Sequence, residues 1–300
     1  MNEAVSRIAL VLTRNRREGV PRAIDLLQSN PVRGKEVTLK PNFNTADPFP
    51  ASTHNETLRA LVLTLREMGA TRIILAERSG PANTRQVMEQ KGIFQMGEEL
   101  GFEVIDLDEL GAEGWVLLHP EGSHWKDGFH FAQVYLEAEC IVQTCCLKTH
   151  AYGGYFTLSL KNSVGMLPHR GYPYMSELHS SPYQRQMIAE INAVYSPDLI
   201  LLDGMEAFVS GGPIVGEKVD AGVMLAGNDR VAIDAAGVAI LRLLGTIPEV
   251  SRGAVFTQEQ IARAAELGLG VQSPAQIQFV TDDAAGEEFA RRLEDILRRE

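Results

Sequence analysis

Residues 36–77 have the sequence EVTLKPNFNTADPFPASTHNETLRALVLTLREMGATRIILAE, and this stretch decides the fold class. Glu36–Leu39 has the composition of a short strand. Thr53 and Glu56 form a capping box, and the apolar residues that follow recur at helical spacing. Thr71–Ala76 is a continuously apolar second strand. A strand, a helix and a strand in this order predict a right-handed βαβ unit with parallel strands.

The same alternation of strands and helices continues on both sides of this unit. It predicts an α/β fold with a mainly parallel sheet and flanking helices. We expect one domain over residues 1–300, arranged as two lobes of about 1–135 and 136–300 with a cleft between them. Further expectations are buried strands at Cys140–Leu147 and Leu199–Asp203, one helix over Thr84–Leu100, a loop over Met205–Gly216, and a long loop over His169–Pro182 that could serve as a lid.

Composition and charge narrow the class of protein. The chain is 45% apolar and 22% charged, which is typical of a globular protein, and its net charge of −11 argues against a nucleic-acid partner. No apolar run approaches the length of about 18 residues that a membrane span needs, and the first residues do not resemble a signal peptide. Three cysteines fit a reducing compartment. We therefore expect a cytoplasmic protein that has no membrane partner.

Lysine is scarce in this chain, since only seven of the 28 basic residues are lysines. Three of the seven, Lys40, Lys148 and Lys161, fall in segments that resemble sites on other grounds. A lysine binds anions as a compact point charge, and its amine becomes a nucleophile when its pKa falls. Chance placement is the alternative.

The first candidate segment follows the first strand of the βαβ unit. Lys40, Asn42 and Glu77 come at the carboxyl ends of strands, where ligands of parallel sheets collect. Thr53 and His54 stand at the start of the helix on the same edge, where backbone N–H groups attract anions. In the alternative interpretation, Asn42 and Thr53 cap turns and Glu77 is a structural partner of Lys40.

The second candidate segment follows the apolar strand Cys140–Leu147. Lys148 and His150 can point the same way if the strand extends that far. Gly153 and Gly154 then allow a close approach of the backbone to a ligand, and Lys161–Asn162 follow. A lone histidine is more often structural, but this combination favours a site.

The third candidate segment holds two carboxylates, Asp203 and Glu206, at the end of a predicted strand. They suit metal ligation, general-base catalysis or pairing with the lysines. Alternatively, Asp203 caps a turn and Glu206 is solvated. Cys145 and Cys146 lie within an apolar run and are interpreted as core. The sequence has no Walker loop, no dinucleotide-binding glycine motif and no Cys-x-x-Cys.

In this order, the segments resemble the domain of unknown function 362 family over about residues 36–270. The pairing of Lys-Thr-His with Lys-Asn-x-x-Gly is the most specific feature. Members are often fused to ferredoxin-like segments, whereas this chain lacks cysteines at the spacing of an iron–sulfur cluster. The resemblance rests on Lys40-Pro41-Asn42, Thr53-His54, Gly69-Ala70, Glu77, Leu147–His150, Leu158–Gly165, Pro197–Leu199, Asp203-Gly204, Gly211–Pro213, Gly216, Asp229 and Asp234-Ala235.

A weaker similarity connects the chain to nickel-pincer lactate racemases, in which a histidine and a Gly-rich stretch precede the lysine that tethers the cofactor. His150, Gly153, Gly154 and Lys161 repeat this layout. The arginines that follow the Thr-His of that family are missing here. The similarity implies a related fold and leaves an identical reaction in doubt.

Together, these observations predict an enzyme that binds a small carboxylate or phosphate in a cleft lined by lysines and histidines. Lys40 and Lys148 would neutralise the anion, and His150 or His54 would move a proton. Lys161 would contact the anion or carry a covalent attachment. Glu77, Asp203 and Glu206 would tune the lysines or hold a divalent metal. The cofactor-binding candidates are Lys40, Asn42, Thr53, Gly153, Gly154 and Asn162.

Two other functions compete with this prediction. The fusions in the resembled family imply a non-catalytic accessory or carrier protein for an iron–sulfur partner such as a ferredoxin. In the other interpretation, the lysines make buried ion pairs that only set the packing, although such pairs are a poor source of net stability. Assembly as a homodimer is an expectation from the prevalence of dimers alone.

Overall fold

The computed structural model describes residues 5–299, in which one mixed sheet of nine strands forms the centre. Eight strands follow the order β11-β1-β10-β9-β7-β2-β3-β4, and β8 pairs with β7 off this path. Only β10 and β8 run antiparallel to their neighbours, so the predicted α/β fold with a mainly parallel sheet is confirmed. The strands are β1 (Ser6–Leu12), β2 (Glu36–Lys40), β3 (Arg72–Glu77), β4 (Glu103–Asp106), β7 (Cys140–His150), β8 (Tyr155–Thr157), β9 (Leu199–Gly211), β10 (Gly216–Gly227) and β11 (Ile277–Val280), beside a separate hairpin of β5 (Trp115–Leu118) and β6 (Phe129–Ala132).

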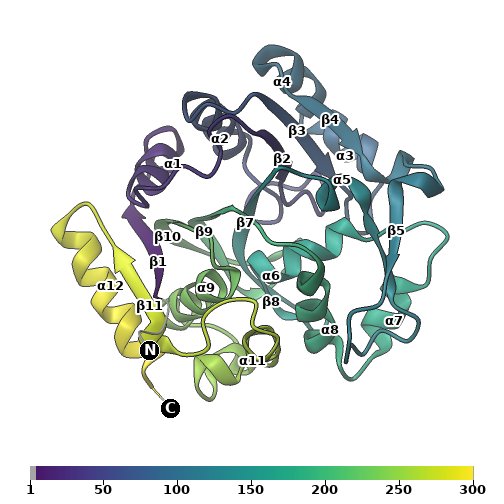
Figure 1. Cartoon of the computed structure of the whole chain (residues 1–300). Coiled ribbons are helices and arrows are strands. Elements are labelled where there is room, and N and C mark those ends of the chain that lie inside the picture. The colour runs from purple at the N-terminus through teal and green to yellow at the C-terminus, as the bar shows by residue number, and fades with distance from the viewer. Residues whose placement is uncertain (1–4, 300) are drawn as a thin grey trace.

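Helices cover both faces of the sheet (Figure 1). Alternate residues of a strand point to opposite faces, so Ile8 and Leu10 pack toward α9 while Ala9 and Val11 pack toward α1 and α2. The helices are α1 (Arg16–Asp25), α2 (Asn55–Glu67), α3 (Thr84–Gln90), α4 (Ile93–Leu100), α5 (Gln133–Leu136), α6 (Ser159–Asn162), α7 (Tyr174–Ser180), α8 (Gln184–Ile191), α9 (Arg230–Leu244), α10 (Pro248–Ser251), α11 (Glu259–Glu266) and α12 (Ala284–Leu297).

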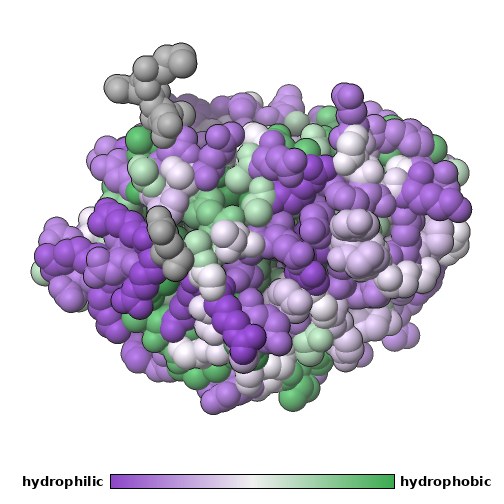
Figure 2. All heavy atoms as spheres, turned by 90° about the horizontal axis from the view of Figure 1, so that it is seen from below, coloured by the Kyte–Doolittle hydropathy of each residue, from purple (hydrophilic) through white to green (hydrophobic). Residues whose placement is uncertain are grey.

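The adjacent cysteines illustrate this alternation. Cys145 belongs to the apolar cluster around α9, and Cys146 belongs to the cluster around α1 and α2. Both thiols are free and buried, in agreement with their interpretation as core. No helix within residues 5–299 is long and apolar enough to cross a membrane. The face seen in Figure 2 is largely hydrophilic, with hydrophobic residues gathered in patches.

Three sequence expectations about loops and helices were wrong. Met205–Gly216 is no loop, because β9 and β10 continue through it as a hairpin that turns only at residues 212–215. The glycines therefore mark the tip of the hairpin: Gly211 and Gly212 have positive φ angles of 74° and 67°. The segment Thr84–Leu100 is two helices, since Gly92 breaks it with φ 66°.

The third difference concerns His169–Pro182, which we expected to be an irregular loop. It contains α7, whose Tyr174 and Leu178 are buried in an aromatic cluster formed with the β5–β6 hairpin and α8. The expected division near residue 135 stays a prediction. Across it, β2 and β7 are hydrogen-bonded neighbours in the sheet.

Candidate functional site

A pocket of about 550 Å³ lies where β2, β3 and β7 end. This position is the edge at which parallel sheets bind ligands. Chain segments far apart in sequence meet there, because these strands are neighbours in the sheet and α6 follows β7 and β8. The predicted residues that line the pocket are Lys40, Asn42, Glu77, Lys148, His150, Lys161 and Asn162.

Lys40 and Glu77 form a buried ion pair in the pocket wall. The Lys40 Nζ atom lies 2.6 Å from Glu77 Oε1 and 2.8 Å from the Pro41 carbonyl oxygen, and it donates a longer bond of 3.3 Å to Asn162 Oδ1. These contacts use all three ammonium donors. Glu77 Oε2 accepts a hydrogen bond from the Phe43 backbone N–H at 2.8 Å. Burial lowers the pKa of Lys40, and the Glu77 carboxylate opposes this shift.

Two asparagines connect Lys40 to Lys148. Asn42 Oδ1 accepts a hydrogen bond from Lys148 Nζ at 2.8 Å, and Asn42 Nδ2 donates to Asn162 Oδ1 at 3.4 Å. Lys148 Nζ also donates to the carbonyl oxygen of Ala51 at 2.5 Å. A lysine has three donors, so one N–H of Lys148 remains for a ligand. Burial lowers the pKa of Lys148.

Lys161 differs from the other two lysines. Its side chain is buried, yet within residues 5–299 no hydrogen bond or ion pair engages its ammonium group. Burial lowers the pKa of Lys161 to about 8, and the positive charges of Arg78 and Lys148 add to this shift. An amine with this pKa is partly neutral near physiological pH and can act as a nucleophile or a base.

His150 is buried, with 7% of its surface exposed. Its Nδ1 atom accepts a hydrogen bond from the Tyr152 backbone N–H at 3.2 Å, which assigns the proton of the neutral ring to Nε2. Burial, followed by the charges of Lys161 and Lys148, lowers the pKa of His150 well below its ordinary value. The ring is therefore a neutral donor at physiological pH.

The glycines after β7 make room for these groups. A Cβ atom on Gly154 would lie 3.1 Å from Lys161 Cε and 3.4 Å from His150 Nδ1, so both side chains pack on the same bare backbone. Gly153 has φ 76°. Gly165 leaves room for Lys40 in the same way, since a Cβ atom there would lie 2.8 Å from Lys40 Nζ.

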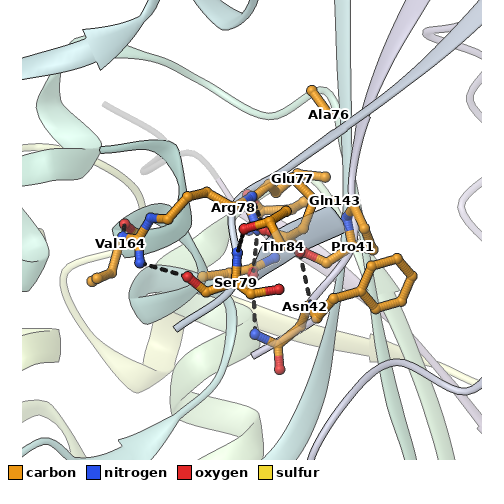
Figure 3. Close-up of polar contacts among 12 residues, drawn as sticks. Pro41, Asn42, Ala76, Glu77, Arg78, Ser79, Thr84, Gln143 and Val164 are labelled. Carbon is orange, nitrogen blue, oxygen red and sulfur yellow. Dashed lines mark hydrogen bonds and ion pairs between the residues drawn. The ribbon is translucent and has the colours of Figure 1, made fainter. Parts of the chain in front are cut away.

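Sequence reasoning missed Arg78, which follows Glu77 directly. Its guanidinium group is buried and donates to the carbonyl oxygens of Leu167 and Ser79, each at 2.9 Å, and to that of Val164 (Figure 3). Burial lowers the pKa of Arg78. Its position one residue beyond a strand end was a signal that could have identified it. His169 and His179 also line the pocket and come from the segment that was expected to be a loop.

Two predicted residues near the start of α2 do not line this pocket. His54 is the N-cap of α2, and its Nδ1 atom accepts a hydrogen bond from the Glu56 backbone N–H at 3.1 Å. The capping residue is thus His54, and the expectation that Thr53 caps the helix was wrong. Thr53 Oγ1 instead accepts a hydrogen bond from the Asn42 backbone N–H at 2.8 Å. Thr53 therefore holds the backbone of Asn42 in place without lining the pocket itself.

The two carboxylates of the third segment lie elsewhere. Asp203 is buried and accepts hydrogen bonds from Arg16 Nε at 2.8 Å and from the Thr57 hydroxyl. Glu206 pairs with Lys218 at 2.9 Å on the exposed part of the β9–β10 hairpin. Neither lines the pocket with Glu77. Among residues 5–299, no group of three or more His, Cys, Asp and Glu side chains is arranged to hold a metal ion.

The balance of charge in the pocket opposes that of the whole protein. The chain carries a net charge of −11, but the pocket lining has four cationic side chains and one carboxylate, Glu77. Because Glu77 is paired with Lys40, the other charged side chains of the lining give the pocket a net positive charge that is removed from water. The cationic residues are Lys40, Arg78, Lys148 and Lys161.

Comparison with known proteins shows the family to which this chain belongs. Residues 37–239 match the family described as Domain of unknown function (DUF362), and the chain belongs to this family. A curated relative, thylakoid-associated protein sll1697 from Synechocystis sp. (strain ATCC 27184 / PCC 6803 / Kazusa), is 24% identical over 252 residues, which cover 81% of this chain and 74% of the relative. Among solved structures, the lactate racemase apoprotein from Thermoanaerobacterium thermosaccharolyticum is 14% identical with a TM-score of 0.46, over 97% of this chain and 86% of the other.

Proposed function

We propose that this protein is an enzyme that binds a small anionic substrate, a carboxylate or a phosphate, in the pocket at the ends of β2, β3 and β7, with Lys161 as the reacting amine. One observation carries the proposal. Lys161 is a buried amine without a partner in the described chain, and it lies among cationic side chains that keep part of it neutral. A desolvated lysine in cationic surroundings is an arrangement that activates the amine as a nucleophile.

Lys40, Lys148 and His150 differ in whether an N–H group remains free to bind the substrate. Lys40 has none, so it serves with Glu77 as part of the wall. Lys148 keeps one N–H and contributes a fixed positive charge for the anion. His150, neutral and protonated on Nε2, can donate a hydrogen bond to the substrate beside Lys161.

A direct test measures anion binding by isothermal titration calorimetry at constant ionic strength. The probes are inorganic phosphate and acetate, and the proteins are the wild type, Lys161→Met and Lys218→Met. Lys218 is a matched control, because it is a lysine on the exposed part of the β9–β10 hairpin. We expect phosphate or acetate to bind the wild type and Lys218→Met, and to lose binding with Lys161→Met.

The variant Lys161→Met should keep the wild-type thermal unfolding midpoint or exceed it, because the amine gives up no hydrogen bond and its burial is costly. A carrier protein would bind the same anions without using Lys161 as a nucleophile. Equal binding of both anions to the wild type and to Lys161→Met would contradict the proposal.

A further inference from the structure

The pocket is much larger than the anionic group that its cationic residues would hold. Its volume of about 550 Å³ falls in the range of about 300–1,000 Å³ of pockets that hold drug-sized ligands. A single water molecule occupies about 30 Å³ in the liquid. A phosphate or acetate ion at the lysines would therefore leave most of the pocket filled by solvent.

The lining changes in character from the inside to the outside. We call the buried groups Arg78, Lys148, His150 and Lys161 the floor; at most 8% of the surface of each is exposed. The residues that line the pocket and remain exposed or half-buried are mixed in character. Four apolar or aromatic ones form what we call the mouth: Pro81, Tyr152, Met175 and Ile214. The polar lining residues of similar exposure are Asn42, Asn44, His169 and His179.

Four separate segments build the mouth. Pro81 comes from the loop after β3, Tyr152 from the turn after β7, Met175 from α7 and Ile214 from the tip of the β9–β10 hairpin. Tyr152 is 65% exposed. Apolar groups that reach one pocket from four segments favour a ligand with an apolar part, because binding such a part removes their surface from water.

The mouth is joined to the floor at two points. The tip of the β9–β10 hairpin packs against the end of β7. The Ala151 backbone N–H donates a hydrogen bond of 3.2 Å to the Gly212 carbonyl oxygen. A Cβ atom on Gly212 would lie 2.1 Å from the Thr149 carbonyl oxygen, so only glycine fits there. On the other side, the sulfur atom of Met175 lies 3.9 Å from an Arg78 guanidinium nitrogen. Apolar mouth and cationic floor are thus parts of one binding surface.

We infer that the ligand of this pocket is an amphiphilic anion, in which one carboxylate or phosphate group binds at the floor and an apolar chain or ring lies against the mouth. This inference rests on the proposed function, since it names the class of substrate for the same site. Ile214 and Met175 are then specificity-determining residues, because they contact the part of the ligand that a short anion lacks.

The test compares butanoate, hexanoate and octanoate with inorganic phosphate by isothermal titration calorimetry at constant ionic strength. For the wild type, affinity should rise by up to about fourfold for each added methylene group. Hexan-1-ol, which has the same chain without the charge, should bind more weakly than hexanoate. Ile214→Ser and Met175→Ser should each reduce the rise in affinity that accompanies each added methylene group.

Val215→Ser is the matched control. Val215 is the next residue of the same hairpin tip, it is 80% exposed, and it does not line the pocket. This variant should keep the full dependence on chain length. If phosphate or butanoate binds but affinity does not rise with the chain length of the carboxylate, the inference is overturned and the proposed function stands. Failure of the wild type to bind any of the anions would overturn the proposed function itself. If affinity rises steeply with chain length and Ile214→Ser and Met175→Ser leave this rise unchanged, the apolar chain of the ligand does not lie against the mouth.

Discussion

The carboxylate of Asp234, on α9, accepts a 2.8 Å hydrogen bond from the backbone N–H of Ser159, the first residue of α6. It also accepts a bond of 3.2 Å from the Leu160 N–H. The first N–H groups of a helix have no partner inside the helix. Asp234 therefore caps, from a distant part of the sequence, the single helical turn that carries Lys161 and Asn162 into the pocket.

Replacing Asp234 with alanine should weaken both stability and ligand binding. The change leaves two buried N–H groups without an acceptor, which costs about 1–3 kcal/mol for each group. α6 then loses its fixed position, and phosphate affinity should fall although Asp234 does not line the pocket. Urea unfolding and calorimetry measure the two effects. Asp234→Asn, which keeps one acceptor oxygen, should restore part of both; wild-type phosphate affinity in Asp234→Ala would contradict this function of Asp234.

The same carboxylate predicts a dependence of stability on pH. Burial raises the pKa of Asp234 from 3.8 to about 7, against the opposing hydrogen bonds from Leu160, Ser159 and Gln260. The folded protein thus holds a proton that the unfolded chain releases at a lower pH. Its contribution to stability is complete below about pH 4 and is lost as the pH rises through 7.

We expect the difference in free energy of unfolding between the wild type and Asp234→Asn to change between pH 5 and pH 8. The wild type should lose stability relative to the variant, because asparagine does not titrate. Urea unfolding at four or five pH values measures this difference. Parallel pH profiles for the two proteins would rule out titration of Asp234 in this range.

The ion pair of Lys40 and Glu77 allows a comparison of buried and exposed charges. Glu77→Gln leaves the Lys40 ammonium buried without its counter-ion and should lower the free energy of unfolding by about 3–5 kcal/mol. Glu206→Gln removes a carboxylate from a pair whose side chains are 44% and 40% exposed, and it should cost about 0–1 kcal/mol. Equal losses of unfolding free energy for the two substitutions would show that removing the buried counter-ion costs no more than removing the exposed one.

Much of the site was predictable because strand ends are visible in the sequence. Lys40, Glu77 and Lys148 each follow or end an apolar run, and parallel strands bring such ends to one edge. The prediction for His54 failed because of the hydrogen bonds at the start of α2. Its ring nitrogen caps α2, a function that the pattern gave to the neighbouring Thr53, whose hydroxyl group bonds to the Asn42 backbone instead.

The remainder depended on tertiary structure. The hairpin of β9 and β10 was hidden because its glycines and Pro213 indicate a loop, whereas only the tip turns. α7 was hidden because its apolar side chains pack into an aromatic cluster formed by distant segments. Both elements contribute to the mouth, so the sequence indicated Lys148, His150 and Lys161 of the floor and did not indicate Arg78, Met175 or Ile214.

Titration of the Lys161 amine tests its proposed function as the reacting group. Trace acetylation with a mass-labelled reagent, read out on the peptide that contains Lys161, gives the fraction of neutral amine at each pH. We expect a pKa of Lys161 of about 8, and a higher value with phosphate present because a bound anion favours the ammonium form. A pKa of Lys161 at the ordinary value of 10.5 that phosphate leaves unchanged would rule out Lys161 as the reacting amine of an anion-binding pocket.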